Sequence, residues 1–158
     1  MELNSLIATY ADRKGLKEIQ LSQEGLIRLI YKEGLVLTFE QSQEGSNFYL
    51  YSGLGKILPE DEKAIFHAAL YGNLFGGQTG RASLGVVPKI NVLILFEFFE
   101  VEAWSDDHFE KEMDRFCHYL LFWMDKIEKI KSESKQDLSM QAHLKGLQDT
   151  GKMRIFFA

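Results

Sequence analysis

YGNLFGGQTGRASLGVVPKINVLILFEFFEVE, residues 71–102, is the stretch of sequence that decides the fold. Its second half, Val92–Phe99, is the most apolar run in the chain and is dominated by β-branched and aromatic residues, which predicts a strand. One set of alternating positions is entirely apolar, and the other is apolar except for Glu97. A strand that is apolar on both faces is covered on both faces, so we expect it to lie in the centre of a sheet.

The first half of this stretch is a glycine-rich connector. Gly76, Gly77 and Gly80 bring the chain in from a preceding helix. A partner strand is predicted at 84–87, and the turn at 88–91, which contains proline and asparagine, joins it to the central strand. We therefore expect a β-hairpin at 84–99.

Helices and strands are also predicted before and after this hairpin. Helices are predicted at the N-terminus as far as Gly15, from Pro59 to about Asn73, and from a cap at 105–107 to about Ile130. Strands are predicted at 26–31, 35–40 and 48–52, joined by short turns. The sequence thus predicts an α+β fold with one five-stranded, mostly antiparallel sheet and three helices, in the order α-β-β-β-α-β-β-α.

The domain organisation follows from a change in composition near residue 131. We expect residues 1–131 to form one α+β domain. Residues 132–158 are predicted to be a polar C-terminal tail with an apolar tip at 153–157, mobile or loosely helical as far as residue 152.

Composition excludes several classes of protein. The chain has 158 residues, 46% of them hydrophobic, and a formal net charge of −5, which disfavours binding to nucleic acid. The N-terminus has no signal-peptide pattern, and no apolar run approaches the ~20 residues that a bilayer requires. With Cys117 as the single cysteine, a disulfide framework is excluded. We expect a cytoplasmic protein that does not insert into a membrane.

No candidate catalytic or cofactor site withstands inspection of the sequence. The segment 72–79 resembles a P-loop, but Gln78 stands in place of the lysine and the segment follows a helix instead of preceding one. Cys117 lies on the apolar stripe of a helix and is interpreted as core. The histidines show no metal-ligand spacing, and Glu97 is expected to have a basic partner or an exposed position. We expect no enzyme activity, no cofactor and no metal.

The strand faces carry more apolar surface than three helices can cover. The strands at 26–31, 35–40 and 48–52 are apolar on most positions of both faces. An uncovered apolar surface usually marks an interaction site. The alternative is that the helices cover more of the sheet and that all these residues belong to the core.

The chain resembles the class I type III secretion chaperones, the Tir-chaperone family. The resemblance covers about residues 1–131 and rests on the element order, on GLGKILP at 53–59, on LFGGQT at 74–79 and on ASLG at 82–85. It implies a bacterial, cytoplasmic chaperone that binds the N-terminal segment of an effector in extended form and keeps it secretion-competent. It also implies a homodimer and no catalytic site.

The resemblance further suggests which residues make these contacts. The expected dimer contacts are Ile65, Phe66, Ala69, Leu74 and Phe75. The expected client-binding residues are Leu3, Leu6, Ile7, Leu29, Tyr31, Val36 and Tyr49. Two other functions stay open: a regulatory module of the same fold that binds a transcription or export component, and a small enzyme that uses Glu97 or the Gly76-Gly77 loop.

Overall fold

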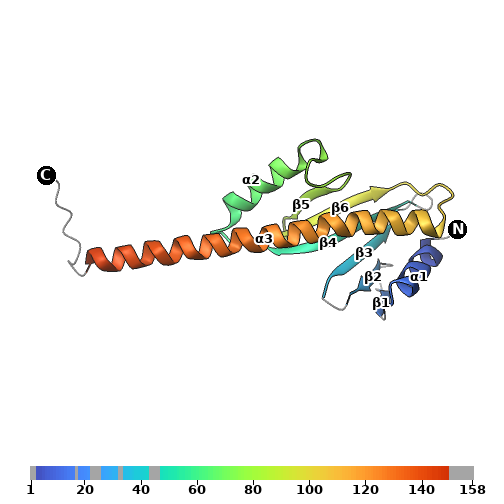
Figure 1. Ribbon diagram of the computed structural model, residues 1–158, viewed down its shortest axis with the longest axis horizontal. Coiled ribbons are helices and arrows are strands. Elements are labelled where there is room, and N and C mark those ends of the chain that lie inside the picture. The colour runs from blue at the N-terminus through green and yellow to red at the C-terminus, as the bar shows by residue number, and fades with distance from the viewer. Residues whose placement is uncertain (1–2, 17, 22–25, 32–33, 43–46, 150–158) are drawn as a thin grey trace.

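A computed structural model describes residues 3–16, 18–21, 26–31, 34–42 and 47–149 (Figure 1). The α+β fold class is confirmed, and the three predicted helices and all five predicted strands are present in the predicted order. The structure adds a short edge strand, β1, before the first predicted strand, so the described sheet has six strands and not five. The elements are α1 (Leu3–Arg13), β1 (Glu18–Leu21), β2 (Leu26–Ile30), β3 (Val36–Gln41), β4 (Phe48–Lys56), α2 (Glu62–Asn73), the 3₁₀ helix η1 (Leu74–Gly76), β5 (Ser83–Val87), β6 (Val92–Phe99) and α3 (Asp106–Asp149).

The strands form one antiparallel sheet in the order β1-β2-β3-β4-β6-β5. As predicted, β6 lies inside the sheet, between β4 and β5, and the hairpin closes where Val87 pairs with Val92. The described edges of the sheet are β1 and β5. Strand β1 was not predicted, because four residues, two of them polar, are too short a run for a periodic pattern.

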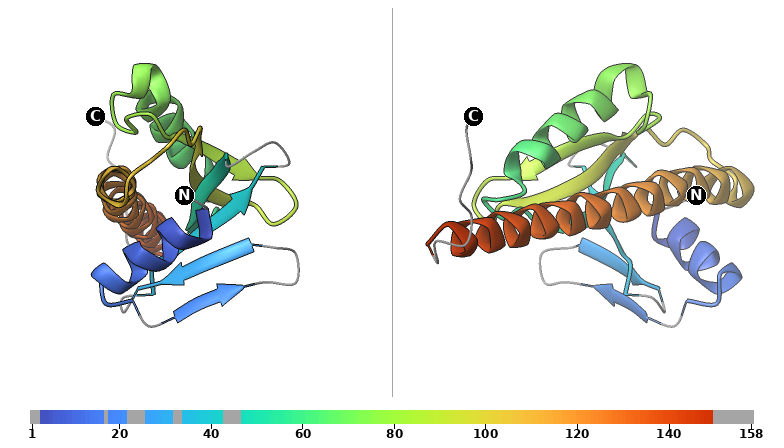
Figure 2. Two further views of the ribbon diagram at one scale, coloured as in Figure 1. Left: turned by 90° about the vertical axis from the view of Figure 1, so that its right-hand side faces the viewer. Right: turned by 60° about the vertical axis from the view of Figure 1, so that its left-hand side comes forward.

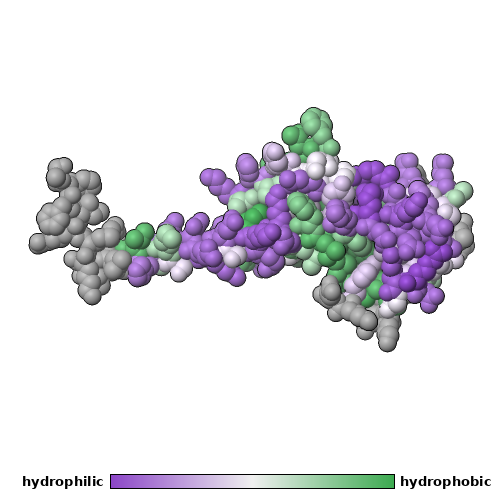
Figure 3. All heavy atoms as spheres, viewed as in Figure 1, coloured by the Kyte–Doolittle hydropathy of each residue, from purple (hydrophilic) through white to green (hydrophobic). Residues whose placement is uncertain are grey.

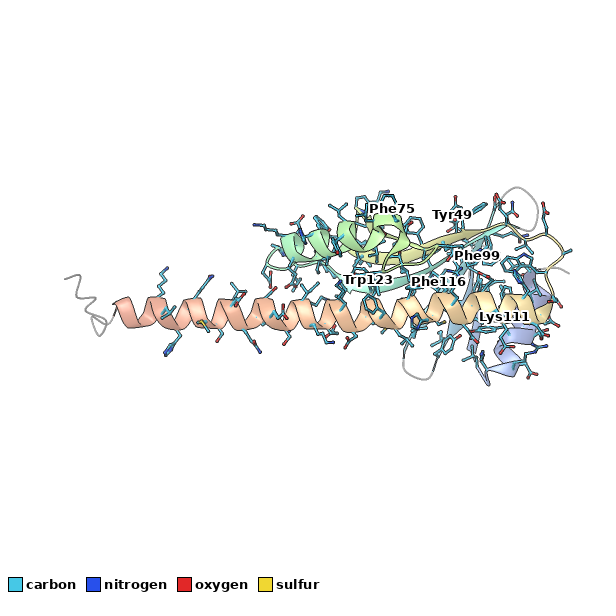
Figure 4. All side chains as sticks on the ribbon, turned by 45° about the horizontal axis from the view of Figure 1, so that its top comes forward. Tyr49, Phe75, Phe99, Lys111, Phe116 and Trp123 are labelled. Atoms are coloured by element: carbon cyan, nitrogen blue, oxygen red, sulfur yellow. The ribbon has the colours of Figure 1, made fainter. Side chains whose placement is uncertain are left out.

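Helices α1 and α3 cover one face of the sheet (Figure 2, left). α1 buries Leu3, Leu6, Ile7 and Tyr10. α3 runs across the sheet and contributes the largest share of the core side chains: Phe109, Met113, Phe116, Leu120, Trp123 and Ile127. Figure 4 shows Phe116 and Trp123 between α3 and the rest of the domain. Every helix in the described part of the chain is too short or too polar to span a bilayer.

The last helix does not end near Ile130 but continues to Asp149, well past the sheet (Figure 1). Residues 131–145 contain no glycine or proline and are rich in lysine, glutamine and leucine, all good helix formers. A helix already nucleated on the core can therefore propagate through them without burying side chains. Residues 150–158, including the apolar tip predicted at 153–157, lie outside the described residues.

The glycine-rich connector is shaped by contacts with α3. A Cβ atom on Gly72 would lie 2.3 Å from Cζ2 of Trp123. The indole Nε1 of Trp123 donates a hydrogen bond of 2.8 Å to the carbonyl oxygen of Gln78, and Nζ of Lys126 donates one of 2.6 Å to Oε1 of Gln78. The P-loop-like segment thus fastens the end of α2 to α3.

Candidate functional site

Strand β6 turns its uninterrupted apolar face away from α1 and α3. Leu93, Leu95 and Phe99 are buried on the helix side, and Glu97 is buried with them at 5% exposure. Their alternating neighbours, Val92, Ile94, Phe96 and Phe98, lie on the opposite face and are all partly or largely exposed. This is the reverse of what burial alone predicts, because the face with the charged residue is the buried one.

A network of ion pairs makes the inward position of Glu97 possible. Oε1 of Glu97 lies 2.6 Å from Nη2 of Arg115 and 3.3 Å from Nε of Arg81. Arg115 also donates a hydrogen bond of 2.8 Å to Glu112, which pairs with Arg81 as well. Burial lowers the pKa of Arg115, but its hydrogen bonds to Glu97 and Glu112 outweigh this and raise it overall. The paired charges let β6 present its apolar face elsewhere.

The open face of the sheet is hollowed into an apolar groove of about 660 Å³, which we call the sheet groove. Cross-strand pairing sets its floor, since Tyr51 pairs with Thr38 on one side and with Phe96 on the other. Among the described lining residues Glu40 alone is charged, so this part of the groove suits apolar side chains. The lining residues are Val36, Thr38, Glu40, Tyr49, Tyr51, Gly53, Val87, Ile90, Val92, Ile94 and Phe96.

Two of the residues expected to bind a client, Val36 and Tyr49, line the sheet groove. Four of the other residues expected to bind a client are buried within the chain: Leu3, Leu6, Ile7 and Leu29 are between 0% and 4% exposed, so a client cannot reach them in this conformation. Leu29 belongs to the face of β2 that α1 and α3 cover, and the three α1 residues pack against that same core.

Tyr31, the last of these residues, is half-buried beside α3. Its hydroxyl group lies 2.7 Å from that of Tyr10, and burial raises the pKa of both phenols. Together with Cys117 it lines a small pocket of about 280 Å³ between the end of α1 and α3. Burial also raises the pKa of the Cys117 thiol, which disfavours the reactive thiolate.

The expected dimer residues divide between the core and the surface. Ile65 and Ala69 are buried within the chain at 1% and 9% exposure. Ile65 therefore has no surface with which to contact a second copy, and Ala69 has little. They occupy the face of α2 that packs on the domain. Phe66 is half-buried, whereas Leu74 and Phe75 are 58% and 98% exposed. Figure 4 shows Phe75 at the end of α2, away from α3.

Most residues of the sheet groove were not predicted from the sequence. Tyr51, Ile90, Ile94 and Phe96 were not named as binding residues, although they form much of its surface. The sequence signal for the groove is the uninterrupted apolar set on alternate positions of β6, a pattern that by itself predicts burial as well as an open binding face. Within the described residues no three histidine, cysteine or acidic side chains are grouped as a metal site.

Comparison with known proteins agrees with this architecture. Residues 5–124 match the model of the Tir chaperone protein (CesT) family. A Chlamydia pneumoniae protein is 25% identical over 124 residues, which cover 77% of this chain and 93% of that protein.

Three solved structures share the fold. The ExsC–ExsE complex contains a chain with a TM-score of 0.62 and 21% identity, covering 79% of this chain and 96% of its own. The HopA1–SchA chaperone–effector complex gives a TM-score of 0.57 at 15% identity, with 77% and 92% covered. The Yersinia pestis type III secretion chaperone SycH, bound to a fragment of YscM2, gives 0.53 at 17% identity, with 80% and 97% covered.

Proposed function

Because the chain belongs to the Tir chaperone protein (CesT) family of type III secretion chaperones, we propose that it binds the N-terminal segment of an effector in extended, non-globular form and keeps that segment competent for secretion. In this proposal the chain is a chaperone without catalytic activity, and it acts as a homodimer in the bacterial cytoplasm. The observation that carries the proposal is the outward apolar face of β6, with the sheet groove built on it.

The sheet groove offers side-chain pockets to an extended client. Burying apolar surface contributes roughly 25 cal/mol per Å², and one well-buried leucine or phenylalanine of the client contributes about 1.5–3 kcal/mol. Several such side chains are needed, because ordering an unstructured segment costs several kcal/mol. Because Glu40 is the one charged side chain among the described lining residues, the groove selects for apolar client residues rather than for a charge pattern.

The edges of the sheet offer a second mode of contact. An extended peptide can add a strand to an exposed edge and gain main-chain hydrogen bonds, while its alternate side chains enter pockets. The edge strand β5 pairs with β6 through Val87 and Val92, both of which line the sheet groove. A client strand beside β5 would therefore be continuous with the groove.

The proposal is tested with N-terminal fragments of the proteins that the host bacterium secretes through its type III system. Isothermal titration identifies the fragment that binds, and the Val36→Asp and Tyr49→Asp variants are then compared with wild type. Each places a charge that becomes buried on binding, so affinity should fall at least tenfold, on the scale of about 1.4 kcal/mol per decade. Melting temperatures should change little, since Tyr49 is 44% exposed.

A matched control is Leu144→Asp, which changes a residue of similar exposure, 43%, on the distal part of α3. It should bind the fragment like wild type. Full affinity in both groove variants would refute the sheet groove as the client site. A secretion assay separates the two kinds of partner: an effector leaves the cell, whereas a regulatory component that stays inside would favour the alternative function.

A further inference from the structure

A second groove lies between α2 and the distal part of α3. It has a volume of about 870 Å³, and we call it the helix groove. Figure 3 shows apolar surface in it between the two helices. Its lining residues are Glu60, Lys63, Ala64, His67, Ala68 and Tyr71 before and along α2, and Lys126, Ile130, Ser134, Asp137, Leu138 and Gln141 along α3.

The α3 side of this groove is specific to the extended helix. All six α3 lining residues follow residue 124, where the family match ends. Their spacing of three and four residues places them on one side of the helix. Ile130 still packs partly against the core, but the α3 lining residues beyond it do not: Leu138 is 48% exposed, and Ile127 is the last buried residue among the described side chains of the helix. The extension therefore builds a surface rather than a core.

The other end of α2 carries an apolar projection, the α2 knob, made of Leu70, Leu74 and Phe75. These side chains are 74%, 58% and 98% exposed, and Figure 3 shows an apolar projection at the end of α2. Phe75 has a φ of 53°, a strained conformation for a residue with a side chain, and it holds its ring in solvent. From Ala64 to Gly80 the chain has no aspartate, glutamate, lysine or arginine. An exposed aromatic knob in a charge-free segment is typical of a protein interface.

We infer that the helix groove receives the α2 knob of a second copy of this chain, an inference that rests on the homodimer of the proposed function. Figure 1 shows that α2 runs along α3 in the opposite direction, so Leu138 lies toward the start of α2 and the knob lies at its end. When two α2 helices pack antiparallel about a two-fold axis, the knob of each copy meets the groove of the other. One symmetry operation thereby fills both grooves.

Area and charge both favour this occupant. A fully buried aromatic side chain removes about 150–250 Å² from water, and Phe75 has almost all of its surface to offer. With Leu70 and Leu74 the knob supplies a large part of the roughly 800 Å² that each partner of a stable complex buries. The knob brings no charge that would need a partner. The groove's own charges, among them Lys63 and Asp137, are of both signs and line its walls, so they can keep water contact at the rim.

Cross-linking tests the contact directly. Cys117 is the only cysteine, so single-cysteine variants Phe75→Cys and Leu138→Cys can be built in a Cys117→Ser background. The two are co-expressed with different tags and treated with a short bis-maleimide. The mixed pair should cross-link at least fivefold more than either variant alone. The matched control replaces Leu138→Cys by Met140→Cys, which changes a residue that is 64% exposed on the same helix but outside the groove.

A dissociation measurement completes the test. Leu138→Asp should raise the dissociation constant of the dimer at least tenfold in sedimentation equilibrium, and Met140→Asp should leave it unchanged. A dimer that cross-links equally through Met140→Cys, or not at all, overturns the helix-groove contact while the homodimer stands. A wild-type monomer at micromolar concentration overturns the homodimer and the contact together. Client binding by titration is scored separately, so a failure of the chaperone proposal is distinguished from both.

Discussion

Tyr49 and Phe98 are direct cross-strand partners on β4 and β6, and their rings lie 4.8 Å apart on the open face of the sheet. They remain 44% and 41% exposed, so part of each ring still faces water. A cross-strand aromatic pair contributes about 0.5–1.5 kcal/mol to stability beyond the effect of the area that it buries. This pair forms an apolar platform beside the sheet groove, on the face of the sheet opposite to α1 and α3.

Leu29→Asp should unfold the protein, in contrast to Val36→Asp. Leu29 is 0% exposed, so the variant places an unpaired carboxylate in the core. That change costs at least about 4 kcal/mol, a large fraction of a typical total stability of about 5–15 kcal/mol. Thermal melts followed by circular dichroism measure this. A Leu29→Asp protein that melts like wild type would show that β2 does not pack under α1 and α3.

Deletion from Ser132 onward should leave the domain folded. Ile127 is the last buried side chain of α3, and the residues beyond Ser134 in the described part of the helix are exposed. The melting temperature should therefore fall by less than about 4 °C, which corresponds to roughly 1 kcal/mol for a chain of this size. The same deletion removes Leu138 and should weaken the dimer. The deletion is compared with Leu138→Asp, which should weaken the dimer to a similar extent. A much lower melting temperature for the deletion than for Leu138→Asp would show that the deleted segment belongs to the core.

Glu97→Ala should destabilise the fold by about 3 kcal/mol, the low end of the cost of breaking a buried ion pair. Arg115 would lose its shortest contact, although its partial exposure lets water compensate in part. The control is Lys129→Ala, which breaks the exposed pair with Asp125 and should cost less than about 1 kcal/mol. Urea denaturation gives both values. Equal, small costs would mean that the network does not hold β6 against α3.

Gly72→Ala should cost about 1–3 kcal/mol, because the added methyl group overlaps the indole ring of Trp123. Gly53→Ala is the matched control, since its Cβ would lie 3.9 Å from the nearest Val92 atom and meet no close contact. Urea denaturation of the two variants compares these costs. A Gly72→Ala protein as stable as wild type would indicate that α2 can move away from α3.

Much of the fold could be predicted from the sequence because it depends on local pattern. The apolar periodicity of 92–99, the turn at 88–91 and the spacing of Phe109, Met113 and Phe116 indicated the right elements in the right order. The acidity of the chain and the absence of a catalytic motif from its sequence indicated a binding protein, and the family match agrees. Strand β1 and the continuation of α3 to Asp149 were missed, because their residues have little apolar periodicity.

The sequence by itself determined that the chain holds more apolar strand surface than its helices cover. Only the tertiary structure decided which surface remains open. Pattern alone would bury the uninterrupted face with Phe96 and Phe98, but Arg81 and Arg115, distant in sequence from each other, converge on Glu97 and make its face the inner one. The charge of a carboxylate can be buried only where partners meet it. These ion pairs join residues that are far apart in the sequence, so only the tertiary structure shows which face of β6 is buried. The other face then supplies residues of the sheet groove.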